Sequence, residues 1–148
     1  MKKTMKYITL EFLSRSSNEA FARTAVACFA AQMDPTLGEL EDIKTAVSEA
    51  VTNAIVHGYP NVLGKVLVKA KICEGNVLEV SVKDRGRGIP DVEKARQPMF
   101  TTGGEERSGM GFTIMESFMD HIAVKSVPGK GTTVTLRKKL APRRRQTA

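Results

Sequence analysis

Three short polar or glycine-rich motifs lie in a fixed order along the chain, and a fold that gives them a common role must bring them together. They are ExxxN at residues 49–53, DRGRG at 84–88 and SGMGF at 108–112. The first lies in a helical pattern of apolar residues, the second directly follows an alternating strand pattern, and the third precedes another helical pattern. The sequence therefore predicts that a helix face, a strand end and a helix start converge on one site.

The spacing of apolar residues predicts the element order β-α-α-β-β-loop-α-β-β. Strands alternate polar and apolar side chains, whereas helices repeat apolar residues every three or four positions. Turn residues at 74–76 and 128–131 join two pairs of strands. The expected strands are 5–13, 65–73, 77–83, 122–127 and 132–139, and the expected helices are 16–33, 36–58 and 109–119.

Two capping-box signatures mark the starts of the first two helices. Ser16-x-x-Glu19 precedes the first helix and Thr36-x-x-Glu39 the second, a spacing at which each side chain bonds the backbone N–H of the other residue. The residues of one face of each helix then recur at helical spacing. They are Phe21, Ala25, Cys28 and Gln32 in the first helix and Leu40, Ile43, Val47, Ala50 and Ala54 in the second.

The hairpins and the paired helices predict an α/β two-layer sandwich, in which helices cover one face of a mixed, mainly antiparallel sheet. With 148 residues the chain has the length of one domain. We expect this domain to span residues 1–140 and residues 141–148 to form a basic, disordered tail. Residues 84–108 make a long connection without a clear period, which is typical of a functional lid.

Composition argues against several classes of function. No apolar run approaches the roughly 18 residues of a membrane span, and Thr4 to Arg15 lack the apolar core of a secretory signal, so a cytoplasmic protein is expected. Cys28 and Cys73 lack CxxC spacing and are expected to be buried thiols. Residues 137–148 supply +6 of the net charge of +7, which leaves +1 for the rest and argues against direct binding of nucleic acid.

Glu49 and Asn53 lie one helical turn apart and therefore on one face of the second helix. An asparagine oxygen is a neutral, hard ligand for Mg2+, which takes one or two protein oxygens and completes its shell with water and phosphate. A carboxylate one turn earlier fits the base that accepts a proton from a nucleophile attacking the γ-phosphate of ATP. The alternative for this pattern alone is an exposed polar helix face. His57, one turn further on, is interpreted as structural.

Asp84 comes directly off a predicted strand, and Gly86 and Gly88 follow it. A strand-end aspartate can accept a hydrogen bond from an adenine amino group, while glycines without Cβ let the backbone approach the ring. Thr132 or Thr133 in the last strand fits a further hydroxyl contact to adenine. The alternatives are an ordinary Asp-Gly turn and threonines that serve only strand propensity.

The third motif lies where the long loop becomes a helix. Unpaired N–H groups at a helix start hold phosphates, glycines permit close approach, and an arginine just before them adds a charge-assisted bond. No GxxxxGK[ST] sequence occurs, so this is not a Walker A loop. The alternative is a flexible helix start. The candidate phosphate-binding residues are Arg107, Ser108, Gly109, Met110 and Gly111.

Together with a GT pair in the last strand, these motifs resemble the Bergerat-type ATP-binding fold shared by gyrase, Hsp90, bacterial histidine kinases and MutL. Within that group, residues 47–55 (VSEAVTNAI), 100–102 (FTT) and 106–116 (ERSGMGFTIME) resemble the anti-sigma F factor family of endospore-forming bacteria. The resemblance covers about residues 5–138 and is most specific in the last of these runs.

The resemblance implies a homodimeric, ATP- and Mg2+-dependent protein serine kinase that sequesters a sporulation sigma factor and phosphorylates a serine of an anti-anti-sigma protein. It implies Glu49 as the catalytic base, Asn53 as the Mg2+ ligand and Asp84 as the residue that reads adenine. An arginine on the first helix contacts the partners in this family, and Arg23 holds that place here. The remaining site residues that the resemblance implies are Gly86, Gly88, Arg107, Gly109 to Gly111, and Thr132 or Thr133.

Other functions share this ATP site. A general-stress anti-sigma kinase has the same motifs, and a nucleotide-gated binding module uses ATP to set its conformation with little turnover. The ATP-binding half of a histidine kinase needs a phosphate-accepting histidine on a helical hairpin. The two histidines of this chain, His57 and His121, lie instead beside the predicted site and at the start of a strand.

Overall fold

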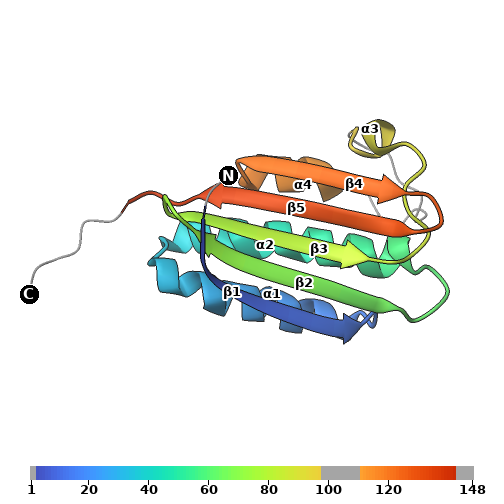
Figure 1. Cartoon of the computed structure of the whole chain (residues 1–148), viewed down its shortest axis with the longest axis horizontal. Coiled ribbons are helices and arrows are strands. Elements are labelled where there is room, and N and C mark those ends of the chain that lie inside the picture. The colour runs from blue at the N-terminus through green and yellow to red at the C-terminus, as the bar shows by residue number, and fades with distance from the viewer. Residues whose placement is uncertain (1–2, 98–110, 143–148) are drawn as a thin grey trace, which may run out of the picture.

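The computed structural model describes residues 3–97 and 111–142, which form two layers (Figure 1). In chain order the elements are β1 Thr4–Leu13, α1 Ser17–Ala30, η1 Ala31–Met33, α2 Leu37–Asn53, η2 Ala54–Gly58, β2 Lys65–Cys73, β3 Val77–Asp84, α3 Val92–Ala95, α4 Gly111–Phe118, β4 His121–Val127 and β5 Gly131–Lys139. The five strands make one sheet, and α1, α2 and α4 all lie on the same side of it. This arrangement confirms the predicted two-layer sandwich.

The sheet has the strand order β1-β2-β3-β5-β4, and each neighbouring pair is antiparallel. Within the described residues it is therefore antiparallel throughout rather than mixed. Its register places Asp84, the last residue of β3, opposite Thr132 near the start of β5. Because directly opposed residues share a face, both side chains lie on the helix-covered side, whereas the next pair, Lys83 and Thr133, lies on the other side.

The core lies between the inner face of the sheet and α2. Alternate residues of the central strands are buried there, as the period of two in each strand requires. The predicted stripe of α2 is confirmed from Ile43 to Ala54, while Leu40 is half-buried. Burying a Leu or Val side chain contributes about 1.5–3 kcal/mol. The buried side chains of this interface include Ile43, Val47, Ala50, Val51, Val66, Val68, Leu78, Val80, Val82, Val134 and Leu136.

The start of α2 has the predicted capping box. Thr36 Oγ1 accepts a hydrogen bond from the Glu39 N–H at 3.0 Å, and Glu39 Oε1 accepts one from the Thr36 N–H at 2.9 Å. The other Glu39 oxygen accepts from the Ala141 N–H at 2.9 Å. The hydrogen bonds from these backbone N–H groups lower the pKa of Glu39, and the bond from Ala141 has the largest effect. They tie the start of α2 to the chain that follows β5.

The capping box predicted at Ser16 is wrong. Ser16 has helical dihedral angles (φ −58°, ψ −29°) and makes no side-chain cap bond. A cap residue needs extended dihedral angles to turn its oxygen toward the helix N–H groups, as Thr36 does with ψ 163°. Glu19 Oε2 instead lies 3.4 Å from Nε of Arg23, one helical turn further on.

The buried face of α1 is one residue removed from the predicted one. Ala22, Val26, Phe29 and Ala30 are buried, while Phe21 is 59% exposed and Cys28 is exposed. Small residues on this face let α1 pack closely against α2 and the sheet, which a face led by Phe21 would not. Cys28 is thus not the buried thiol that we predicted, whereas Cys73 is buried as expected.

The second predicted helix continues without a break as α2 and the π-helical turn η2, which ends at Gly58 as expected. In the long connection, the described part contains a short helix, α3, that was not predicted. Asp91 caps it by accepting the Lys94 N–H at 3.1 Å. The rest of the predicted lid, residues 98–108, lies outside the described residues. No helix in the described ranges combines the length and apolarity needed to cross a membrane.

Candidate nucleotide site

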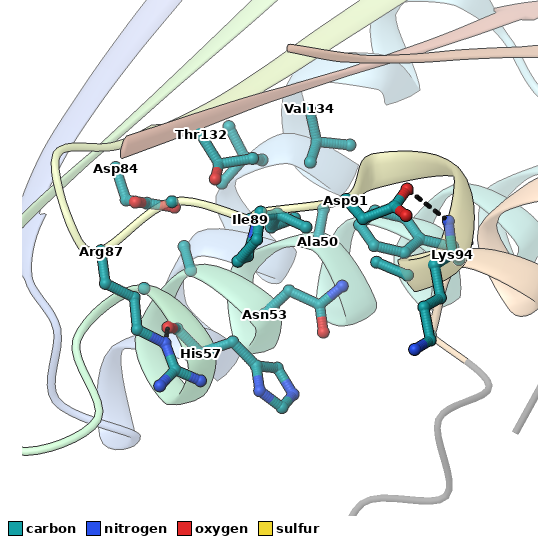
Figure 2. Close-up of a pocket in the computed structure, with 18 residues that line it drawn as sticks. Ala50, Asn53, His57, Asp84, Arg87, Ile89, Asp91, Lys94, Thr132 and Val134 are labelled. Carbon is teal, nitrogen blue, oxygen red and sulfur yellow. Dashed lines mark hydrogen bonds between the residues drawn. The ribbon is translucent and has the colours of Figure 1, made fainter. Parts of the chain in front are cut away.

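A cavity of about 460 Å³ opens between α2, the last residues of β3, the first residues of β5, α3 and the start of α4 (Figure 2). Its walls combine apolar side chains with a few polar groups, which is typical of pockets for small organic ligands. Five predicted site residues line it, namely Asn53, Asp84, Gly88, Gly111 and Thr132. Residues from all three sequence motifs therefore lie around one cavity.

Asp84 and Thr132 form one wall of this cavity. Both are buried, and the Asp84 carboxylate accepts the Gly86 N–H at 2.9 Å. Burial raises the pKa of Asp84, although the N–H groups of Gly86 and Thr132 act in the opposite direction. Thr132 Oγ1 lies 2.8 Å from Ser126 Oγ. The Ser126 hydroxyl also accepts a hydrogen bond from the Ile89 N–H at 2.7 Å. The wall thus presents a preorganised acceptor beside a hydroxyl.

Glycines let the end of η2 pack directly against the loop after β3. A Cβ on Gly86 would overlap the Gly58 carbonyl oxygen, and a Cβ on Gly58 would lie 2.8 Å from Asp84 Cγ. Gly88 has φ +74°, a conformation that side-chain-bearing residues rarely adopt. Gly86 is therefore needed behind the cavity wall, while Gly88 turns the chain along the cavity.

The first and third motifs meet at Gly111, the first residue of α4. A Cβ on Gly111 would lie 3.2 Å from Asn53 Nδ2 and 3.4 Å from Glu49 Oε2. Asn53 lines the main cavity, whereas Glu49 lines a smaller depression of about 200 Å³ next to it. The start of α4 therefore lies over both predicted functional groups of α2.

The smaller depression also brings Arg23 close to the site. It lies between α1 and α2, and Arg23, Lys44, Ser48 and Glu49 are among its lining residues. A segment of another protein that lay along this depression would contact Arg23 and approach Glu49. Glu49 thus lies on the border between an internal cavity and an external groove.

Several other predicted residues are not part of the cavity wall that the structure describes. Thr133 faces the opposite side of the sheet, so Thr132 is the threonine of the pair that lies at the site. Arg107, Ser108, Gly109 and Met110 lie outside the described residues.

Some residues of the cavity were missed as functional groups. Arg87 lies inside the DRGRG motif and Ile89 directly after it, so their positions in the chain were a signal for their proximity. Lys94 reaches the cavity from the unpredicted helix α3, which only the fold reveals. His57, which was interpreted as structural, also lines the cavity.

Comparison with known proteins places this architecture in a family. Residues 13–138 match the family described as histidine kinase-like ATPase domain. Anti-sigma F factors from Thermoanaerobacter sp. (strain X514) and Geobacillus kaustophilus (strain HTA426) are 61% and 59% identical to this chain over 130 and 133 residues. The chain belongs to the anti-sigma F factor family. The matches cover 87% and 89% of this chain and 90% and 91% of those relatives.

Solved structures with the same fold are more distant in sequence. The RsbU and RsbW domains of a Mycobacterium tuberculosis protein superpose with a TM-score of 0.68 at 22% identity, covering 92% of this chain and 32% of that one. The histidine kinase domain of a blue-light activated kinase from Erythrobacter litoralis gives a TM-score of 0.56 at 19% identity, and the match covers 84% of this chain and 64% of that one. These similarities show that the family shares its fold with histidine kinases.

The residues present fit an adenine nucleotide with a phosphate-bound cation. The cavity has a buried acceptor at Asp84 and apolar walls from Ala50, Ala54, Ile89 and Val134, which suit a flat aromatic base. Among the described residues no cluster of three or more His, Cys, Asp or Glu side chains occurs. Mg2+ commonly takes most of its ligands from phosphate and water, so Asn53 as a single protein ligand fits such a cation.

Proposed function

We propose that this protein is an ATP-dependent protein serine kinase that also acts as an anti-sigma factor. The observation that carries the proposal is the convergence of Asp84, Asn53 and Gly111 on one cavity, with Glu49 at its border. Relatives about 60% identical to the chain are named anti-sigma F factors, and the family domain is an ATPase of the histidine kinase type. The name of these relatives supports the binding of a sigma factor, and the residues around the cavity support phosphoryl transfer.

The Asp84 end of the cavity binds the adenine. The Asp84 carboxylate accepts the adenine amino group, and the Thr132 hydroxyl contributes a second polar contact. Gly86 and Gly88 keep the backbone close to the ring, and Ile89 covers one side of it. Since a buried carboxylate is costly, a bound donor adds to the backbone N–H groups that already stabilise Asp84. This arrangement selects a base with an amino group at that position.

The Asn53 end of the cavity receives the phosphates. Asn53 Oδ1 would hold Mg2+, which would supply positive charge to offset that of the phosphates. The start of α4, at Gly111, lies beside Asn53, and a helix start favours anions. We assign the preceding residues to phosphate binding as well, namely Arg107, Ser108, Gly109 and Met110.

Glu49 acts as the general base. The serine oxygen of the protein substrate attacks the γ-phosphorus, the bond from that phosphorus to the bridging oxygen breaks, and ADP leaves. The serine proton passes to the Glu49 carboxylate. The groove that joins Arg23 to Glu49 gives the substrate a path to this group from outside the cavity.

The partners follow from the family. We propose that a sporulation sigma factor binds to the ATP-bound protein and that an anti-anti-sigma protein supplies the serine. Arg23 contacts both, the protein acts as a homodimer, and it works in the cytoplasm. A general-stress anti-sigma kinase would use the same site with a different sigma factor, so the captured partner separates these two functions.

A transfer assay tests the kinase role. The protein is incubated with γ-labelled ATP, Mg2+ and an anti-anti-sigma protein of the family, and label on serine is measured. We expect Glu49→Gln to lose transfer by at least about 100-fold, the scale of general-base catalysis, while ATP binding is kept. Glu74→Gln, which removes a carboxylate from the exposed β2–β3 turn, serves as the control.

The transfer assay also separates the kinase from a nucleotide-gated binding module. Transfer by Glu49→Gln at the parental rate would show that Glu49 is not the base. Absence of transfer by the unsubstituted protein, together with ATP-dependent capture of a sigma factor, would favour the binding module. Capture is followed by mass spectrometry of the protein retained in ATP and in ADP.

A further inference from the structure

Two cationic side chains lie at the open side of the cavity, and the proposed mechanism does not use them. Arg87 and Lys94 both line the cavity. Figure 2 shows their charged ends on the same side as the Asn53 amide, while Asp84 and Thr132 form the opposite wall. A ligand whose base lies at Asp84 and whose anionic part extends toward Asn53 would therefore pass between these two cations.

Arg87 is held in place by both its backbone and its side chain. Its Nε donates to the His57 carbonyl at 3.0 Å, and its N–H donates to the Gly58 carbonyl at 3.0 Å. Its own carbonyl accepts the Gly129 N–H at 2.7 Å. These bonds join the loop after β3 to the end of η2 and to the β4–β5 turn. The guanidinium is thus preorganised at the mouth of the cavity.

Lys94 comes from the other side of the mouth, on α3. Asp91 caps this short helix, and Arg96 just after it forms an ion pair with Glu116 of α4 at 2.7 Å. α3 also packs against β4. The helix that carries Lys94 is therefore anchored to α4, whose start lies beside Asn53 and Glu49. Lys94 and Asn53 line the same cavity, so a ligand that fills it lies between them.

We propose that Arg87 and Lys94 form a cationic rim that binds the phosphate chain of a nucleoside triphosphate. This inference rests on the proposed ATP site and adds two phosphate-binding residues to it. Charge-assisted hydrogen bonds to phosphate are stronger than neutral ones, and the arginine fork suits phosphate oxygens. The rim adds affinity for the phosphates and leaves recognition of the base to Asp84.

Isothermal titration calorimetry with ATP and with adenosine tests the rim. Adenosine has the base and the ribose but no phosphate, so it separates phosphate binding from the shape of the cavity. We expect Arg87→Gln and Lys94→Gln each to weaken ATP binding about threefold to tenfold, the range for a partly exposed charge contact. Adenosine affinity should change by less than about twofold, and Arg87→Lys should recover part of the ATP affinity.

Lys83→Gln is the matched control, because it removes the same charge from the exposed side of the sheet, next to Asp84 in sequence. It should leave both affinities unchanged. Unchanged ATP affinity in both rim variants, or equal losses for ATP and adenosine, would overturn the rim as a phosphate contact. If the unsubstituted protein binds adenosine but not ATP, the rim is overturned along with the proposed function. If the unsubstituted protein binds ATP and the rim variants bind it with the same affinity, the rim is overturned but the proposed function is not.

Discussion

Gly111 lies directly against the carboxamide of Asn53, so close that a Cβ on Gly111 would be 3.2 Å from Asn53 Nδ2. The same Cβ would be 3.4 Å from Glu49 Oε2. The absence of a side chain on the first residue of α4 therefore leaves space beside Asn53 and Glu49, where the proposed mechanism puts the phosphates.

Gly111→Ala should weaken Mg-ATP binding without weakening the fold. Alanine is favoured over glycine in a helix by up to about 1 kcal/mol, so the melting temperature should stay the same or rise. The added methyl group displaces the Asn53 amide, and we expect ATP affinity to fall roughly threefold to tenfold, about 1 kcal/mol. Gly38→Ala is the control, since a Cβ there meets only Thr36 Oγ1 at 3.9 Å. Equal ATP affinity in Gly111→Ala and the parent would show that this space is not used.

Asn53→Ala should reduce affinity for Mg-ATP much more than for ATP in the presence of a chelator. The substitution removes one neutral ligand of the cation and leaves the adenine contacts at Asp84 in place. Calorimetric titrations with and without Mg2+ measure the difference. A similar loss under both conditions would assign Asn53 to the structure of the cavity and not to the cation.

Asp84 should make the stability of the nucleotide-free protein depend on pH. Burial raises its folded-state pKa above the usual 3.8, so the folded protein holds this proton more tightly than the unfolded chain does. Its contribution to stability is fully present below pH 3.8 and is lost as pH rises through the folded pKa. Relative to Asp84→Asn, the parent should therefore gain stability as pH falls through that window.

Urea unfolding at a series of pH values measures this difference between the parent and Asp84→Asn. A difference in free energy of unfolding that stays constant with pH would contradict the raised pKa. The same variant should lose ATP affinity, because asparagine has one acceptor oxygen where the carboxylate has two, so its NH2 group would face either the Gly86 N–H or the adenine amino group.

The two helix starts should respond differently to loss of their hydroxyl groups. Thr36→Ala removes an N-cap bond and should cost about 1 kcal/mol in the free energy of unfolding. Ser16→Ala removes a hydroxyl that makes no cap bond, and it should change stability by less than about 0.5 kcal/mol. Chemical denaturation of both variants gives the comparison. A loss at Ser16 as large as that at Thr36 would contradict the assignment of the caps.

These caps also show what the sequence could predict. The Ser16 and Thr36 signatures have the same spacing, yet only Thr36 has the extended backbone that a cap needs. That backbone is set by how the chain enters the helix from its neighbours, which spacing does not report. In α1 the sheet and α2 select the face led by Ala22 over that led by Phe21, again through packing between distant segments.

The positions of the candidate residues were predictable where one motif positions its own residues. Asp84 at the end of a strand and Asn53 one turn after Glu49 required only local periodicity. Thr132 could not be separated from Thr133 until the register of β3 and β5 placed it opposite Asp84. Lys94 could not be found at all, because its position depends on α3, a four-residue helix that is anchored to α4 through Arg96 and Glu116.

The most direct test is a crystal structure of the protein with Mg2+ and a non-hydrolysable ATP analogue. We expect the adenine amino group within hydrogen-bond distance of the Asp84 carboxylate and Asn53 Oδ1 at about 2.0–2.1 Å from Mg2+. The γ-phosphate should lie on the Glu49 side of Asn53. A nucleotide bound outside this cavity, or bound with its phosphates at Asp84 and its base at Asn53, would contradict the convergence of the three motifs on one ATP.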